Sequence, residues 1–149
     1  MSALIVDSSM RDTARPILSV LIPFLRDDPR ALLAVLDTEA ASLNGAVELV
    51  VLDDGTADAA LTSALTDGVA AMTLPVRPTP LPANEGRSIG RNRLASAARG
   101  RALLFLDSDM RPDHERFLKT WADLAATGET AVAFGGFSLL QAPHDARFA

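Results

Sequence analysis

The feature that most constrains the fold of this chain is a regular alternation of short apolar runs with longer segments of helical periodicity. We expect strands at 17–22, 47–52, 72–76, 102–106 and 131–134. Between them, helical spacing covers 29–43, 58–65, 88–99 and a stretch that opens at Pro112. Helices that connect buried strands make right-handed crossovers between parallel neighbours. The alternation therefore predicts an α/β fold of three layers, with a mostly parallel sheet between two layers of helices.

Local signals refine this expectation. The run at 102–106 is expected to be the clearest buried strand, whereas Pro75 places 72–76 at an edge of the sheet or makes that strand irregular. Asp58 and Asp113 are expected to cap the helices that follow them. The connection after the third strand is expected to be stiffened by Pro78, Pro80 and Pro82.

Length and composition limit the domain organisation. The chain has 149 residues, of which 48% are hydrophobic, and this suits one compact domain over 17–149. Residues 1–16 carry interspersed charges and lack a signal-peptide apolar region, so we expect a partly disordered leader. There is no cysteine, and no apolar run approaches the roughly 20 residues of a membrane span. We expect a cytoplasmic protein, with peripheral membrane attachment as the alternative.

Acidic residues stand directly after two of the expected strands, namely Asp53 and Asp54 after the second and Asp107 and Asp109 after the fourth. The carboxyl ends of parallel strands share one edge, where ligands bind near a switch in strand order. Carboxylates gathered there would repel an anionic ligand unless a divalent cation joined them, and Mg²⁺ uses one or two carboxylates together with phosphate oxygens. We therefore expect a site for a metal ion and a diphosphate. For a single aspartate, a turn or capping role is the alternative.

The net charge of −5 argues against nucleic acid as a partner, because a general grip on nucleic acid needs a basic face. A dinucleotide-binding domain needs Gly-x-Gly-x-x-Gly after the first strand, where residues 23–26 read PFLR. His114 and His144 have no partners at ligand spacing, so we expect surface residues and no zinc site. Trp121 lies on the inner face of its helix and is expected in the core.

Four blocks of sequence, in this order, resemble family-2 glycosyltransferases of the GT-A fold. They are 18–23 (LSVLIP), 48–56 (ELVVLDDGT), 84–86 (NEG) with 90–92 (GRN), and 103–109 (LLFLDSD) with Pro112 shortly after. The blocks are specific in combination and cover Leu18 to Pro112. The resemblance implies an inverting, metal-assisted transfer of a sugar from a UDP-sugar to an unidentified sugar, lipid or protein acceptor.

The resemblance also implies roles for the residues at matching positions. Nucleotide binding would involve Pro23, Phe24, Leu25, Asp53, Asp54, Gly55, Asn84, Gly86, Arg91, Asp107 and Ser108. Within this set, Asp54 would accept from the uracil imide and Arg91 would approach the diphosphate. Asp107 and Asp109 would hold Mn²⁺ or Mg²⁺, which neutralises the leaving diphosphate. For Arg91, a solvated surface charge is the alternative.

The same resemblance indicates a truncated domain. In this family the catalytic base is an acidic residue well beyond the Asp-x-Asp strand, and after residue 137 only Asp145 is acidic. We therefore assign no catalytic residue and expect a nucleotide-sugar-binding portion that lacks the acceptor-binding half. The parent would be a hexosyltransferase-type enzyme of polysaccharide biosynthesis, whereas the isolated chain would bind donor without transfer. A non-catalytic scaffold that forms a homo-oligomer through the exposed truncated face is the alternative.

Overall fold

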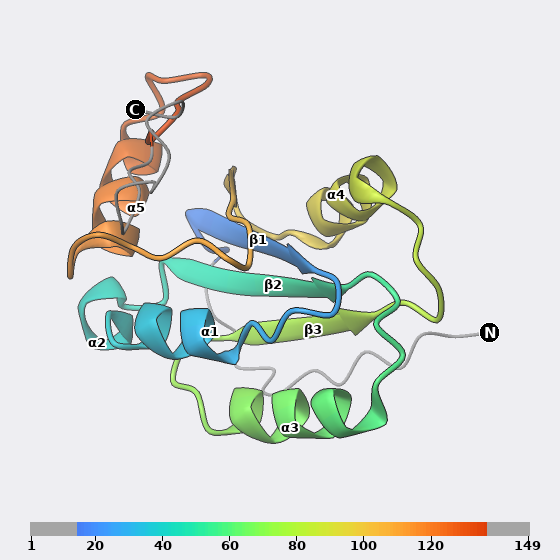
Figure 1. Cartoon of the computed structure of the whole chain (residues 1–149). Coiled ribbons are helices and arrows are strands. Elements are labelled where there is room, and N and C mark those ends of the chain that lie inside the picture. Colours follow the sequence, from blue (N-terminus) through green and yellow to red (C-terminus); the bar gives the residue numbers. More distant parts are fainter. Residues whose placement is uncertain (1–14, 137–149) are drawn as a thin grey trace, which may run out of the picture.

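A four-stranded parallel sheet lies at the centre of the computed structural model, which describes residues 15–136 (Figure 1). The order β3-β2-β1-β4 places β1 between β2 and β4, and all three strand pairs are parallel. The predicted α/β class with a mostly parallel sheet is confirmed. The elements in chain order are β1 (Leu18–Phe24), α1 (Arg30–Asp37), α2 (Ala40–Leu43), β2 (Val47–Asp53), α3 (Ala59–Ala70), β3 (Val76–Pro80), α4 (Arg87–Ala97), β4 (Ala102–Phe105) and α5 (Phe117–Thr127).

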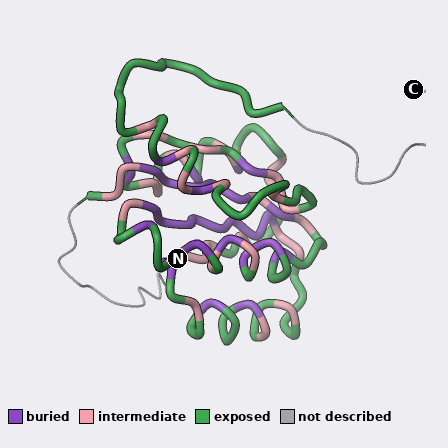
Figure 2. The backbone as a smooth tube through the Cα atoms, turned by 90° about the vertical axis from the view of Figure 1, so that its left-hand side faces the viewer, coloured by how far each residue is buried: buried purple, intermediate pink, exposed green. Residues whose placement is uncertain are grey.

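Helices cover the two faces of the sheet unequally. Successive side chains of each strand point to opposite faces. One face packs against α1, α2, α3 and α5 through a large apolar core that includes Val20, Val51 and Leu118. The other face carries α4, whose Leu94 packs against Leu21. Figure 1 shows α3 and α4 on opposite sides of the sheet, and Figure 2 shows long buried stretches of backbone in the middle of the molecule. The three predicted layers are therefore present.

The strand expected to be most buried, 102–106, has one open face. β4 pairs with β1 alone among the described strands, and Leu103 and Phe105 are each 44% exposed. The register places Phe105 opposite Leu21, which packs against α4. Leu103 and Phe105 therefore lie on the face of the sheet that carries α4. Because α4 packs against β1 and β2, it leaves the row on β4 uncovered. The expectation of a buried strand was therefore wrong for Leu103 and Phe105, whereas Leu106 at the end of the run is buried.

The edge strand β3 begins at Val76, later than predicted, and contains Pro78 and Pro80. The backbone groups of Pro75 and Leu81, on either side of it, hydrogen bond to β2. Because alternate residues of a strand bond to the same neighbour, the backbone nitrogens of positions 78 and 80 face away from β2. A proline at these positions, which lacks an N–H, therefore costs no hydrogen bond between the strands. The edge position is confirmed, but these two prolines belong to the strand and not to the connection after it.

Two helices differ from expectation, and one buried carboxylate lies where they meet. The helix expected over 29–43 is divided into α1 and α2, and Glu39 lies at the break. Its carboxylate accepts the N–H of Leu118 at 2.8 Å and that of Lys119 at 3.1 Å. α5 therefore begins at Phe117 with Glu39 against its first turn, and Asp113 does not cap it. Asp58 caps α3 as predicted.

Residues 131–134 are not a strand. Val132 and Phe134 are 90% and 84% exposed, and none of the described strands pairs with them. An extended segment without a neighbour leaves its ladder groups unpaired, so the β-rich composition alone does not make a strand there. As predicted, Trp121 packs against the large core and His114 is exposed.

Some expectations fall on parts of the chain that the structure does not describe. Residues 1–14 of the expected leader lie outside the described range, as do Asp145 and His144. Within 15–136, no helix has the length and apolar character needed to cross a membrane.

Candidate functional site

The order of the strands produces a topological switch at β1. The crossovers from β1 to β2 and from β2 to β3 run over the face that carries α1 and α3, whereas the crossover from β3 to β4 runs through α4 on the other face. Open α/β sheets bind ligands at the carboxyl ends of strands beside such a switch. The segments that follow β1, β2 and β4 therefore form the candidate site.

The turn after β2 is shaped by Asp53 and Gly55. Asp53 is buried, and its Oδ1 accepts the N–H of Thr56 at 2.9 Å. Gly55 has a φ of +85°, and a Cβ at this position would lie 2.3 Å from the backbone nitrogen of Asn84. Only glycine lets the 83–84 segment pass this close. The turn after β2 and the loop before α4 are thus packed as one unit, and the Asn84 side chain is exposed on it.

Asp54 is buried and joins this unit to the start of α4. Its Oδ1 accepts the N–H of Glu85 at 2.8 Å, and its Oδ2 accepts that of Gly86 at 3.2 Å. The N–H of Asp54 donates to the carbonyl of Phe24 at 2.9 Å, which ties the turn to β1. Each carboxylate oxygen has a second lone pair, so a ligand N–H can still be accepted. In this structure the carboxylate of Asp54 orients the loop.

The second acidic position is also connected to α4. Oδ1 of Asp107 lies 2.8 Å from Nη2 of Arg91, and its Oδ2 lies 3.9 Å from Nη2 of Arg87. Arg91 is therefore not simply a solvated charge, because its guanidinium lies at the carboxyl end of β4. A metal ion at Asp107 would share this carboxylate with Arg91.

Few protein side chains are available to a metal ion at the predicted metal site. Asp109 is exposed, and Ser108 is half-buried. Residues 15–136 contain no group of three or more histidine, cysteine or acidic side chains arranged to hold a metal ion. Two carboxylates are nevertheless sufficient for Mg²⁺ when phosphates and water supply the remaining ligands. Asp107 and Asp109 therefore fit a metal bound together with a diphosphate, and do not form a closed site by themselves.

The residues predicted to line a base pocket after β1 differ in burial. Phe24 is only 4% exposed and belongs to the large core. There it borders a cavity of about 140 Å³ between α3 and the sheet, with Val51 and Leu65. Pro23 and Leu25 are half-buried at the end of the strand. These two side chains are therefore more exposed to solvent than the Phe24 ring.

Two contacts at the site were not predicted from the sequence. Arg26 has a φ of +63° and donates its N–H to Oγ1 of Thr56 at 2.8 Å, which joins the segments after β1 and β2. Glu85 forms an ion pair with Arg93 of α4. The hydrogen bond from Arg93 lowers the pKa of the Glu85 carboxyl below its ordinary value. Neither contact has a signal in sequence spacing, because each depends on how a loop is placed.

A family model and two solved structures match most of the chain. Residues 19–139 match the model described as glycosyl transferase family 2. S. aureus TarS 1-349 in complex with UDP-GlcNAc is similar with a TM-score of 0.61 and 23% identity, over 83% of this chain and 37% of that one. The mannosyltransferase PcManGT from Pyrobaculum calidifontis, in complex with GDP-Man and Mn²⁺, is similar with a TM-score of 0.59 and 17% identity, over 82% and 34%. The chain thus spans little more than a third of either structure. No curated protein matches it.

Proposed function

Because this chain belongs to glycosyl transferase family 2 and has the GT-A fold, we propose that it is the nucleotide-sugar-binding portion of an inverting glycosyltransferase. One observation carries the proposal, namely that Asp54 and Asp107 both bond to α4 or the residues that begin it, beside the switch in strand order. Two acidic positions are thereby brought to one edge of the sheet together with Arg91, a cation that can face a diphosphate.

The proposed donor is a UDP-sugar bound with Mn²⁺ or Mg²⁺. The ligands in the two similar structures, UDP-GlcNAc in one and GDP-Man with Mn²⁺ in the other, support this class of molecule. Asp107 and Asp109 would hold the metal, which as a Lewis acid neutralises the leaving diphosphate. Asp54 would accept from the uracil imide, and Arg91 would contact the diphosphate. Pro23 and Leu25 would border the base.

The proposal assigns donor binding, and not transfer, to this chain. Inversion requires a base that deprotonates the acceptor hydroxyl as it attacks the anomeric carbon, and we assign that role to none of residues 15–136. Hexosyl transfer to a sugar, lipid or protein acceptor, in polysaccharide biosynthesis, is proposed for the whole enzyme. We propose that this enzyme is located in the cytoplasm or at a membrane surface. Incubation of the purified chain with UDP-GlcNAc and candidate acceptors should yield no glycosylated product, and any transfer above background would contradict the assignment.

Calorimetric titration with UDP, once with Mn²⁺ and once with EDTA, tests donor binding. We expect clear binding with the metal and much weaker binding without it. Equal binding in the two titrations would remove the metal from the proposal. Absence of binding in both would remove the nucleotide site itself.

A second candidate function, self-association without catalysis, is favoured by the open row on β4. Leu103 and Phe105 are half-exposed there, and no described strand pairs with the outer edge of β4. Apolar side chains beside a free strand edge favour pairing with another chain. In this alternative the chain would form a homo-oligomer whose formation does not depend on nucleotide.

A further inference from the structure

β2 provides a carboxylate for each end of α4. Glu48 lies near the start of the strand and Asp54 directly after its end, about 20 Å apart in an extended backbone. The 11 residues of α4 span about 16 Å, so the two carboxylates can reach opposite ends of the helix. Between them, Leu52 packs so closely that a Cβ on Gly90 would lie 3.0 Å from its Cδ2. Contacts from β2 and from the residue that follows it thus reach both ends and the middle of the helix, which also packs against β1.

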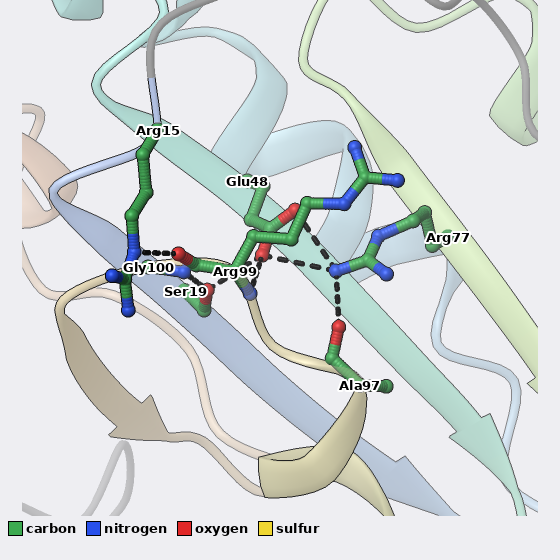
Figure 3. A network of polar contacts seen from close by, with 7 residues as sticks. All are labelled: Arg15, Ser19, Glu48, Arg77, Ala97, Arg99 and Gly100. Carbon is green, nitrogen blue, oxygen red and sulfur yellow. Dashed lines mark hydrogen bonds and ion pairs between the residues drawn. The ribbon is translucent and has the colours of Figure 1, made fainter.

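Glu48 is the centre of a polar network at the end of α4 that lies away from the candidate site (Figure 3). Its Oε1 accepts the hydroxyl of Ser19 at 2.6 Å and the backbone N–H of Arg99 at 2.7 Å. Both of its oxygens lie 3.0 Å from Nη2 of Arg77, and the same nitrogen donates to the carbonyl of Ala97 at 2.6 Å. Three neighbouring strands thus each supply one side chain to this network.

The network also seats the connection from α4 to β4 on the sheet. The N–H of Gly100 donates to Oγ of Ser19 at 2.8 Å. A Cβ on Gly100 would lie 2.5 Å from the backbone nitrogen of Ser19, so the chain passes directly over β1 here. Neither the helix end nor the connection can shift without breaking bonds to Ser19 or Glu48.

Burial of the charges in this network costs free energy, which indicates that the network has a role other than stabilising the fold. Glu48 is 3% exposed, and a buried carboxylate is tolerated only when it is paired and hydrogen bonded. Nε of Arg77 is buried without a hydrogen-bond partner, so the network is not fully satisfied. Well-packed apolar residues would often stabilise a fold as well or better. Directional bonds from Glu48 and Arg77 fix the rotation and the axial position of α4, which apolar contacts specify less strictly.

We propose that Glu48 is a positioning residue for donor binding, and that it acts through α4 on Arg91. With its C-terminal end fixed by Glu48 and Arg77, α4 presents Arg91 to Asp107 and presents the N–H of Gly86 to Asp54. The inference rests on the proposed function, because it assumes that a nucleoside diphosphate contacts Arg91. The affinity for this ligand then depends partly on the contacts of Glu48 at the C-terminal end of α4, away from the ligand.

The substitution Glu48→Gln tests this role, because it keeps the size of the side chain and an acceptor oxygen but removes the charge that holds Arg77. Amide hydrogen exchange should become faster at Arg99 and Gly100, and also at Glu85 and Gly86, without any nucleotide. The affinity for UDP with Mn²⁺ should fall about fivefold, the size of coupling between residues of one network. In an Arg91→Ala background, Glu48→Gln should cause a clearly smaller loss of affinity, because only the effect through Asp54 remains.

Glu39→Gln is the matched control, because Glu39 is also a buried carboxylate that accepts two backbone N–H groups, but at α5 on the other face. It should leave UDP affinity and exchange at Glu85 and Gly86 unchanged. If Glu48→Gln does not fold, Arg77→Lys serves in its place. An affinity that falls equally in both Arg91 backgrounds, or that does not fall, overturns the inference. If the unsubstituted chain binds no UDP, the proposed function fails, and unchanged exchange at Glu85 and Gly86 separately overturns the positioning of α4.

Discussion

Arg91 of α4 and Asp107 after β4 form an ion pair, with 2.8 Å between Nη2 and Oδ1. The acidic motif is therefore less negative than its sequence indicates, since a guanidinium already offsets one of its two aspartates. A diphosphate would attract Arg91, and a metal ion would attract Asp107. Either ligand would then weaken the ion pair between Arg91 and Asp107, which competes with the binding of the other ligand. We therefore expect nucleotide and metal to bind cooperatively.

Arg91→Ala should change the two affinities in opposite directions. Mn²⁺ alone should bind more tightly, because the carboxylate of Asp107 no longer has a cation beside it. UDP with Mn²⁺ should bind about tenfold more weakly, the effect expected for one charge-assisted hydrogen bond. Calorimetry measures both. Arg93→Ala on the same helix, which removes the pair with Glu85 instead, should leave the affinity for Mn²⁺ alone unchanged. A parallel change of both affinities in Arg91→Ala would contradict the account.

Gly55→Ala should destabilise the chain much more than Gly45→Ala. Both glycines have positive φ, +85° and +77°, but a Cβ on Gly45 meets no atom within 4 Å, whereas one on Gly55 meets the 83–84 backbone. Gly45→Ala should cost about 1 kcal/mol from backbone strain alone. Gly55→Ala should cost at least twice as much, roughly 2–3 kcal/mol, because backbone must also move. Chemical denaturation followed by circular dichroism measures the difference, and equal costs would show that the 83–84 segment does not depend on Gly55.

The Glu85–Arg93 pair should make a small pH-dependent contribution to stability. The hydrogen bond from Arg93 lowers the pKa of Glu85 in the folded chain. This contribution is therefore present above the ordinary pKa of a glutamate and is lost as the pH falls through the lowered value. Carboxyl NMR titration should show Glu85 titrating at lower pH than in Arg93→Gln, where its pKa should return to the ordinary range. Identical titration curves in the two proteins would disprove the pairing in solution.

Phe105→Ser should reduce self-association if the open row on β4 mediates it. Light scattering over a range of concentrations should then show a lower average mass for this variant than for the unsubstituted chain. Leu124→Ser is the matched control, because Leu124 is an exposed apolar residue on α5, away from β4. A monomeric unsubstituted chain at every concentration would remove the self-association hypothesis.

The alternation of strands and helices predicted the class and layers of the fold because it depends on local periodicity. The acidic residues that follow β2 and β4 were predicted to lie at one edge of the sheet, since parallel strands end on the same side. The burial of 102–106 was not predictable from its composition, because exposure of Phe105 depends on where α4 lies. The same holds for Phe24, which was expected beside the nucleotide but packs into the large core.

The networks of Glu39 and Glu48 also had no signal in the sequence. Glu48 bonds to Ser19 and Arg77, 29 positions away in either direction, and Glu39 bonds to Leu118, 79 positions away. Such distances along the chain follow no helix or strand spacing. Both carboxylates lie in otherwise ordinary sequence, and only the packing of α4 and α5 on opposite faces gives them their partners.

The most direct test of the central claim, that the carboxylates after β4 bind a metal together with a nucleotide diphosphate, is calorimetry of UDP with Asp109→Asn. We expect that Mn²⁺ no longer increases the affinity of this variant, while Asp113→Asn in the same loop keeps the full increase. An undiminished effect of Mn²⁺ on UDP binding by Asp109→Asn would contradict the claim.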